Sequence, residues 1–332
     1  MKVYNKQSDR KLNSELLQKL DEFRKIRNFD TKKYINDKAN LLNLYMRKSK
    51  LSACVIAVSG GIDSAIVLGI VNYAQKQQSS PIKKIIPLLL PISKSIGVTN
   101  QDDATKRGKE LCECLNIEPH IVDLSEINDL IRKTLEPNLN IVGEGWAIGQ
   151  LGPYTRTPIL YYTTSLLNQS GYGTIICGTT NKDEGAYLGY VGKASDGMVD
   201  VQLISDIHKS EVYQVAKYLK LPKSIINVIP SGDMYDNRCD EVVFGASYDF
   251  VELYLNYLKL TSNQKIEFVK SLSSESKQQF KFFASNLENL HNYNKHKYIA
   301  KSPAVHLDLY DSSIKGGWDN YYKVTQRYLN GK

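Results

Sequence analysis

The stretch Cys54-Val55-Ile56-Ala57-Val58-Ser59-Gly60-Gly61-Ile62-Asp63-Ser64-Ala65 begins with an apolar run, turns at Ser-Gly-Gly and continues into an apolar periodic run. This order predicts a buried strand, a tight turn and a helix. The two glycines let a ligand approach the backbone closely, and free amides at the start of a helix favour an anion. Ser59 and Ser64 add hydroxyl donors, and Asp63 offers a carboxylate that can hold Mg²⁺ beside a phosphate.

This loop differs from two familiar phosphate-binding patterns. It lacks the lysine of GxxxxGK[ST] and the spacing of GxGxxG, so it predicts neither a Walker loop nor a Rossmann dinucleotide fingerprint. The alternative is a glycine turn that only joins a strand to a helix. Six specified positions between an apolar strand and a periodic helix favour the phosphate-binding interpretation.

The composition is that of a globular protein. The chain has 332 residues, of which 42% are hydrophobic, so it can form a sizeable core. It contains no apolar run of about 18 residues, and its first residues lack the apolar centre of a signal peptide, so we expect a cytoplasmic protein without a membrane span. A net charge of +8 suits anionic ligands. The 43 Lys and Arg residues are scattered along the chain, which does not indicate a nucleic-acid site.

Predicted strands and helices alternate along the middle of the chain. This alternation indicates an α/β fold, a Rossmann-like parallel sheet with helices on both faces, whose ligands bind beyond the carboxyl ends of the strands. Residues 136–150 are expected to be irregular, and residues 156–168 to form a helix rich in Tyr and Leu. Helical extensions are expected at both ends of the chain. The expected strands are 54–58, 85–90, 121–122 and 174–177, and the expected units are an N-terminal extension (1–48), a catalytic domain (49–260) and a C-terminal extension and tail (261–332).

Two loops carry a family resemblance. The segment Ser59-Gly60-Gly61-Ile62-Asp63-Ser64 resembles the pyrophosphate loop of the ATP pyrophosphatases, whose fold is adenine nucleotide alpha hydrolase-like. A second polar loop, Gly178-Thr179-Thr180-Asn181-Lys182-Asp183-Glu184, follows a predicted strand, and with later motifs it resembles NAD⁺ synthase over roughly residues 30–258. The later motifs are Tyr187-Leu188-Gly189-Tyr190, Lys193, Asp196-Gly197, Asp200, Lys209-Ser210-Glu211-Val212, Pro230-Ser231, Asp240-Glu241, Gly245 and Tyr248-Asp249.

The resemblance implies an ATP-dependent ligase that forms an amide. In this family ATP adenylates the nicotinate carboxylate of deamido-NAD⁺, and ammonia then displaces AMP, which leaves NAD⁺, AMP and pyrophosphate as products. The adenylation is needed because a carboxylate is unreactive towards ammonia until it carries a good leaving group. The implied ligands are therefore ATP, Mg²⁺, deamido-NAD⁺ and ammonia, and the implied assembly is a homodimer with the substrate site across its interface.

The resemblance also assigns roles to individual residues. Asp63 and Glu184 match the Mg²⁺ ligands of the family, and Lys209 matches a lysine near the reacting phosphate, where its charge would stabilise the transition state. Asp196 matches the carboxylate that orients or deprotonates ammonia, whereas His208 is expected to be structural. The positions that match ATP contacts are Ser59, Gly60, Gly61, Asp63, Ser64, Thr179, Lys209 and Ser231, and those that match deamido-NAD⁺ contacts are Arg156, Lys193, Asp200, His296 and Lys297.

The chain departs from the family pattern at several points. Tyr154 stands where relatives often carry the first of two arginines, and one extra residue lies between Glu184 and Leu188. Glutamine-using relatives carry an N-terminal amidase domain with a Cys nucleophile, whereas the residues before Cys54 include no Cys. We therefore expect the nitrogen to come from free ammonia or from a separate glutaminase.

Two other functions stay open. One is an ATP pyrophosphatase that acts on a different acceptor, either as an amide ligase on another carboxylate or as an RNA-modifying enzyme. The other is a non-enzymatic nucleotide sensor, although the intact Asp63, Glu184 and Lys209 count against it. Pyrophosphate release with deamido-NAD⁺, other carboxylates or tRNA would distinguish the three functions.

Overall fold

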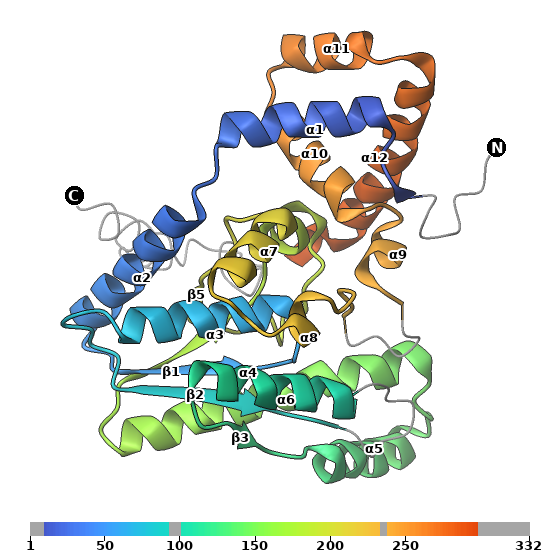
Figure 1. Cartoon of the computed structure of the whole chain (residues 1–332). Helices are drawn as coiled ribbons and strands as arrows, with labels where there is room; N and C mark the ends of the chain where they lie inside the picture. Colours follow the sequence, from blue (N-terminus) through green and yellow to red (C-terminus); the bar gives the residue numbers. More distant parts are fainter. Residues whose placement is uncertain (1–9, 93–100, 233–237, 298–332) are drawn as a thin grey trace, which may run out of the picture.

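The computed structural model describes residues 10–92, 101–232 and 238–297, and its centre is a parallel sheet of five strands in the order β3-β2-β1-β4-β5 (Figure 1). Ala53 of the central strand β1 pairs with Lys84 of β2 and with Thr174 of β4. This topology confirms the α/β fold expected from the sequence. The strands are β1 (Ala53–Ala57), β2 (Lys84–Leu89), β3 (His120–Ile121), β4 (Thr174–Gly178) and β5 (Val201–Gln202).

Helices cover both faces of the sheet. Successive side chains of a strand point to opposite faces, so the apolar side chains of β1 pack against helices on each side. Cys54 and Ile56 of β1 belong to a core shared with α2, α3, α4 and α7, whereas Val55 belongs to a core formed with α6. The connection from β3 to β4 runs through α5 and α6. These helices are α2 (Thr31–Lys48), α3 (Ile62–Gln75), α4 (Gln101–Leu115), α5 (Ser125–Leu139), α6 (Gly145–Gln169) and α7 (Lys209–Tyr218).

A second core lies above the sheet in Figure 1 and is made of helices alone. Leu16 and Leu20 of α1 pack there with Phe250 of α10 and with Phe280 and Phe283 of α12. The packing thus crosses the boundaries expected at residues 48 and 260, because α2 joins the sheet core while α1 and α10 join this helical core. The helical core comprises α1 (Ser14–Arg27), α9 (Asp240–Phe244), α10 (Tyr248–Leu258), α11 (Ser262–Ser271) and α12 (Ser274–Asn294).

Two sequence-based predictions are wrong in part. Residues 136–150 are not irregular throughout, since α5 continues to Leu139 and α6 begins at Gly145. Glycine and proline lower local helix propensity, but packing overrides propensity, and α6 packs against β1 and β4 with Pro153 and Pro158 inside it. Strand β5 (Val201–Gln202) was not predicted. The remaining short elements are α8 (Lys223–Ile226), the π-helical turn η2 (Glu184–Leu188) and the 3₁₀ turn η3 (Lys295–Lys297).

The topology brings the two polar loops together. β1 lies where the strand order reverses, with β2 and β3 on one side and β4 and β5 on the other. Ligands of open α/β sheets bind at such a switch point, beyond the carboxyl ends of the strands. Residues 58–61 leave β1 at this point, and residues 179–183 leave its neighbour β4. Among the described helices, none combines the length and apolarity needed to cross a membrane.

Candidate active site

The loop after β1 is held in shape by its own serines. The Ser64 hydroxyl donates to the Gly61 carbonyl at 3.1 Å and lies 3.1 Å from the Ser59 hydroxyl. The Ser59 amide donates to the Ser64 hydroxyl at 3.2 Å. Helix α3 begins after Gly61, an N-cap residue without a side chain to bond the first amides of the helix. The loop is therefore preformed, with the start of a helix directed at the place where a phosphate group would bind.

Gly60 is required by a neighbouring helix as well as by a ligand. Its φ of 77° lies in the left-handed region, and a Cβ atom there would lie 2.3 Å from the Ala104 carbonyl oxygen of α4. The Arg107 guanidinium of α4 also donates from Nε to the Gly60 carbonyl at 3.0 Å. Ligand approach is the expected reason for both glycines, and the close contact with α4 is a second reason at Gly60.

A buried ion cluster joins the two loops to α7. The ammonium of Lys209, whose side chain is only 2% exposed, lies 2.5 Å from Asp63 Oδ2 and 3.1 Å from Glu184 Oε1. Asn181 Nδ2 donates to Asp63 Oδ1 at 2.9 Å and to Glu184 Oε1 at 2.7 Å. The structure thus brings together the three charged residues that the sequence analysis singles out from three separate segments.

The backbone of Lys209 is fixed by a second buried pair. Asp183 accepts a hydrogen bond from the Lys209 amide at 2.7 Å and pairs with His208 Nδ1 at 2.6 Å, and both side chains are fully buried. Glu211 accepts from the His208 amide at 2.9 Å, which completes a capping box at the start of α7. These contacts fit the structural role expected for His208, because they hold the residue that precedes Lys209.

Tyr248 connects the ion cluster to the segment after α8. Its hydroxyl lies 2.7 Å from both Glu184 Oε1 and Asp240 Oδ2, and its single proton can be donated to only one of them at a time. Asp240 also accepts from the Gly232 amide at 2.7 Å. Glu184 is therefore linked through two side chains to the backbone next to Ser231.

The cluster has unusual acid–base properties. Burial raises the pKa of Glu184 to about 7, and Asp63 and Asp240 add to this effect while the Lys209 charge opposes it. Burial opposes the charge on Lys209, but Asp63 and Glu184 together raise the pKa of its ammonium above the ordinary range. Lys209 therefore stays protonated, and Glu184 takes up or loses a proton near neutral pH.

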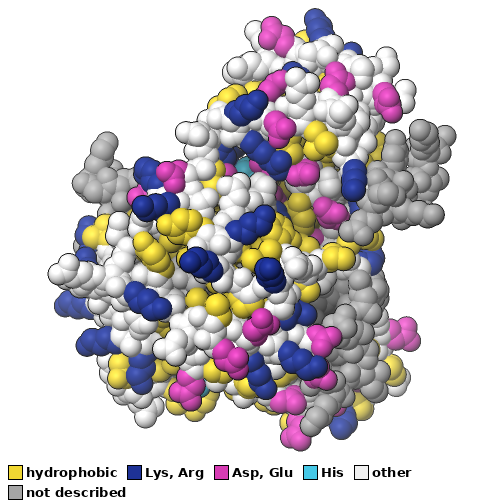
Figure 2. Space-filling view, in the orientation of Figure 1, with side chains coloured by type: hydrophobic (Ala, Val, Ile, Leu, Met, Phe, Trp, Pro, Cys, Tyr) yellow, Lys and Arg dark blue, Asp and Glu magenta, His cyan; other side chains and the backbone are white. Residues whose placement is uncertain are grey.

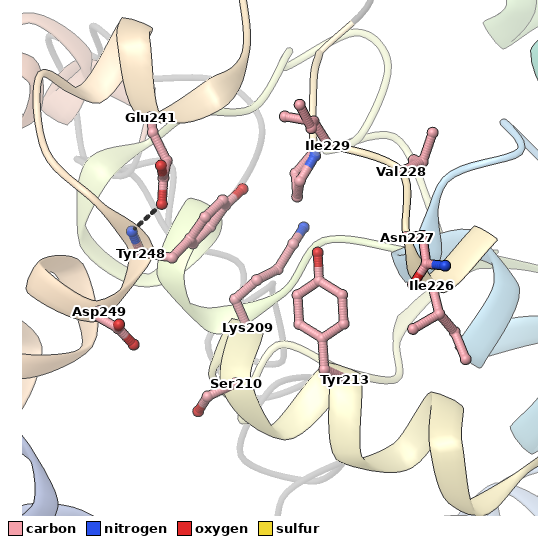
Figure 3. A pocket seen from close by; sticks show the side chains of 11 residues that line it. Lys209, Ser210, Tyr213, Ile226, Asn227, Val228, Ile229, Glu241, Tyr248 and Asp249 are labelled. Atoms are coloured by element: carbon pink, nitrogen blue, oxygen red, sulfur yellow. Dashed lines mark hydrogen bonds between the residues drawn. The ribbon is translucent and has the colours of Figure 1, made fainter. Parts of the chain in front are cut away.

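A cavity of about 320 Å³ opens beside Lys209, between α7 and residues 226–230. Figure 3 shows the Lys209 side chain extending between the rings of Tyr213 and Tyr248. The ammonium lies 4.8 Å from the centre of the Tyr248 ring. Because Lys209 belongs to both the cavity wall and the ion cluster, an anion bound in the cavity would face the same charge that neutralises Asp63 and Glu184.

The residues matched to substrate contacts lie outside this cluster. Arg156 on α6 donates from Nε to the Leu90 carbonyl at 3.2 Å, and a second nitrogen lies 3.2 Å from Gln101 Oε1. Asp196 is exposed and closes a turn, since its Oδ2 accepts from the Gly192 amide at 2.9 Å. Asp200 accepts from the Ile176 amide at 2.7 Å beside β5, and Lys193 is exposed.

Four further residues from the sequence analysis lie at loops or at the end of α12. Thr179 is half-buried at the end of β4, and Ser231 is exposed. His296 is exposed, and its Nδ1 lies 3.1 Å from the Tyr293 carbonyl. The Lys297 ammonium donates to the carbonyls of Gly189 and Val191 at 2.8 and 2.6 Å, so it holds backbone rather than pointing away from the protein.

Sequence reasoning missed three side chains that complete the cluster. Asn181, Tyr248 and Asp240 all fall within the quoted motifs, but nothing in the motifs shows that they contact Asp63 or Glu184. The available signals were weak. Asn181 is a polar residue three positions before Glu184, and Tyr248 stands at the start of a helix.

The comparison with known families agrees with the geometry. The family model described as NAD synthase matches residues 34–299. The chain belongs to the NAD synthase family. Members of this family are ligases of NAD biosynthesis that use ATP for an amidation.

Related sequences support the same assignment, and two solved structures share the fold. An NH(3)-dependent NAD(+) synthetase of Campylobacter jejuni is 30% identical over 237 residues, which cover 71% of this chain and 87% of the relative. One from Thermoplasma acidophilum is 32% identical over 224 residues, covering 67% and 84% of the two chains. The fold resembles an NMN synthetase from Francisella tularensis (TM-score 0.63, 24% identity, 84% of this chain and 98% of the other). It also resembles the NH3-dependent NAD synthetase from Campylobacter jejuni (TM-score 0.62, 23% identity, 84% and 100%).

The raised pKa of Glu184 predicts a pH-dependent stability. In the folded protein this carboxyl keeps its proton up to about pH 7, whereas its ordinary pKa is 4.5. The folded state therefore binds more protons between these values, so the free energy of unfolding should fall as the pH rises through this window. We expect Glu184→Gln to flatten this slope in urea unfolding without nucleotide or metal. The control is Glu118→Gln at an exposed position, and an unchanged slope in Glu184→Gln would contradict the prediction.

Proposed function

We propose that this protein is an ammonia-dependent NAD⁺ synthase: ATP adenylates the nicotinate carboxylate of deamido-NAD⁺, and ammonia then displaces AMP. The observation that most supports this proposal is the buried cluster of Lys209, Asp63 and Glu184. It lies next to the Ser59–Ser64 loop, which its own serines hold in shape. A fixed positive charge beside two carboxylates suits the binding of a triphosphate with a divalent ion, and the relatives named above are NH(3)-dependent NAD(+) synthetases.

In this proposal the loop and Lys209 bind the phosphates of ATP. Ser59, Ser64 and the first amides of α3 would donate hydrogen bonds to phosphate oxygens, and Gly60 and Gly61 would keep Cβ atoms out of their way. Thr179 and Ser231 would contribute hydroxyls from the ends of two further segments. The ammonium of Lys209 would stabilise the charge that develops on the departing pyrophosphate.

Asp63 and Glu184 are suited to hold Mg²⁺. Both carboxylates already face a common positive charge, the ammonium of Lys209. Among the described residues, no group of three or more His, Cys, Asp or Glu side chains is placed to hold a metal ion. Two carboxylates fit Mg²⁺ nonetheless, because this ion usually takes one or two protein carboxylates and completes its coordination with phosphate oxygens and water. When bound, the ion would neutralise charge on the phosphates.

Deamido-NAD⁺ would bind through Arg156, Lys193, Asp200 and His296, with Asp196 next to the ammonia. The Lys297 ammonium is instead held by the carbonyls of Gly189 and Val191. Asp196 is exposed, so its carboxylate is open to a small cation. Ammonium has no lone pair for attack, and a carboxylate that takes its proton would supply neutral ammonia beside the adenylate.

The substrate can be tested directly. We expect the purified protein to form NAD⁺ from deamido-NAD⁺, ATP, Mg²⁺ and ammonium, with one pyrophosphate released for each NAD⁺. Nicotinate mononucleotide is the comparison substrate, because a protein of similar fold is titled an NMN synthetase. Product formation is followed by chromatography. Preferential amidation of the mononucleotide would overturn the dinucleotide assignment, and pyrophosphate release only with another carboxylate or tRNA would overturn the proposed function.

We also propose a homodimer formed through α5 and α6. Exposed apolar side chains gather on these helices, including Leu130 and Leu139 on α5 (each 64% exposed) and Tyr162 on α6 (66%). A closed two-fold dimer is the commonest assembly of soluble proteins. Light scattering should show a dimer for the native chain and a shift towards monomer for Tyr162→Glu. Ile26→Glu, at an 81% exposed position on α1, is the control and should stay dimeric. A native monomer at micromolar concentration would contradict this proposal.

The two half-reactions should separate in Asp196→Asn. The amide oxygen can still accept the Gly192 amide that closes the turn, but the charge and the base are lost. We expect pyrophosphate exchange into ATP to persist and NAD⁺ formation to fall on the order of 10²–10⁴-fold, the usual effect of removing a general base. Ser195→Ala removes the second hydrogen bond to the Asp196 carboxylate and should change both rates little. An equal loss of exchange and NAD⁺ formation in Asp196→Asn would assign Asp196 to substrate binding or to the turn.

A further inference from the structure

Helix α12, the last long helix of the described residues, carries a polar residue at every third position near its end. Glu288, His291 and Asn294 lie on α12, and Lys297 follows on η3. Residues three apart are neighbours on a helix surface, so the four side chains form a line that winds gradually around the helix, which we call the α12 stripe. The stripe runs along residues 187–191, a segment far away in the sequence.

Each member of the α12 stripe forms a hydrogen bond with residues 187–191, and successive members of the stripe contact successive parts of this segment. Glu288 accepts from the Tyr187 hydroxyl at 2.7 Å. His291 stacks on the Tyr187 ring, with centres 3.9 Å apart and planes 3° from parallel, and its Nδ1 lies 2.7 Å from the Tyr187 carbonyl. Asn294 Nδ2 donates to the Leu188 carbonyl at 2.9 Å. The Lys297 ammonium donates to the carbonyls of Gly189 and Val191, as described above.

The bonded segment lies between the two proposed functional carboxylates. Glu184 begins the π-helical turn η2, which ends at Leu188, and Gly189 follows with a left-handed φ of 61°. The chain then runs to the turn closed by Asp196. The last carbonyls of any helix lack donors within the helix. The α12 stripe supplies donors to the carbonyls of Tyr187, Leu188 and Gly189.

The segment begins with an uncommon type of helix. Residues Glu184–Leu188 form the π-helical turn η2. A π-helical turn is rare and is often found at functional sites. The carbonyls at the end of this turn have no donors within the turn. Hydrogen bonds from the α12 stripe therefore help to hold its backbone in one conformation.

We propose that the α12 stripe is a positioning device, which fixes the segment 184–196 so that Glu184 faces Lys209 and Asp196 faces the acceptor site. This inference rests on the proposed function for the roles of Glu184 and Asp196, but the contacts themselves do not. It also assigns Lys297 to holding the loop rather than to binding deamido-NAD⁺ directly. Asn294 is 5% exposed, so its amide serves the protein interior, and burial lowers the pKa of Lys297 while the Asp196 charge partly offsets this effect.

The helix itself supplies matched controls. Asn294→Ala and Lys297→Met remove donors of the stripe. Asn292→Ala and Lys295→Met change the same residue types at exposed neighbouring positions, where the two side chains bond only each other at 3.1 Å in the described structure. Lys297→Arg keeps a charged donor at the stripe and serves as the rescue variant.

Hydrogen exchange tests the stripe without any substrate. We expect amides of residues 185–197 to exchange at least about tenfold faster in Asn294→Ala and Lys297→Met than in the two controls, with α3 and β1 unchanged. The same rates in stripe and control variants would overturn the proposal, whatever reaction the protein catalyses. Faster exchange throughout the chain would also overturn it, because the stripe would then serve general stability.

Kinetics tests the functional consequence once the native protein makes NAD⁺. We expect kcat to fall on the order of 10–100-fold in Lys297→Met, because small displacements of reacting groups have effects of this size. The KM for deamido-NAD⁺ should change little, and Lys297→Arg should recover most of kcat. A rise in that KM with kcat unchanged would show direct substrate binding by Lys297 and overturn the positioning role. If the native protein makes no NAD⁺, the proposed function fails while the exchange result still decides the stripe.

Discussion

The buried ammonium of Lys209 is the constraint on which the site depends. An unpaired charge in a protein interior is strongly destabilising, so Lys209 can be 2% exposed only because Asp63 and Glu184 lie against it. These residues come from the first turn of α3, which follows the loop after β1, from the first residue of η2, which follows the loop after β4, and from the start of α7. The cluster therefore fixes three segments relative to one another, and the parallel sheet is the framework that delivers two of them to the same edge.

The same cluster explains how charge can be exchanged during the proposed reaction. Lys209 can leave the carboxylates only if another anion takes its place as a partner, since its pKa keeps it protonated. A triphosphate beside the Ser59–Ser64 loop is such an anion, and the released carboxylates are then free to bind a divalent ion. Lys209 and the two carboxylates would each keep an oppositely charged partner during binding, so no unpaired charge would be left in the protein interior. Figure 2 shows that basic and acidic side chains are mixed over the visible face. The closely packed charges of Lys209, Asp63 and Glu184 lie in the buried cluster instead.

The sequence was sufficient for those parts of the site that depend on short segments. The strand before Ser59, the loop at Asp63 and the polar loop ending at Glu184 each carry their own local pattern. The alternation of strands and helices predicts a parallel sheet, whereas the order of its strands comes from the structure. By contrast, the contacts of Asn181, Tyr248 and the α12 stripe join residues from distant segments, and no local pattern encodes such pairing. The start of α6 was missed for a related reason, because packing on β1 and β4 overrides the local effect of its glycines and prolines.

The site lies at the junction of two cores, and helix α1 ties them together. Arg24 pairs with Glu252 and Asp249 of α10, each at 2.7 Å, and Arg27 pairs with Glu211 in the capping box of α7. Glu252 and Glu211 are almost fully buried, so these pairs are less screened by solvent than ordinary surface ion pairs. One helix thus holds the start of α10, which carries Tyr248, at a set distance from the start of α7, which carries Lys209. Because Tyr248 also bonds Glu184, a shift of the helical core relative to the sheet would change the ion cluster itself. The helices outside the sheet are therefore part of the site's framework, and α1 and α12 constrain it from opposite ends of the chain.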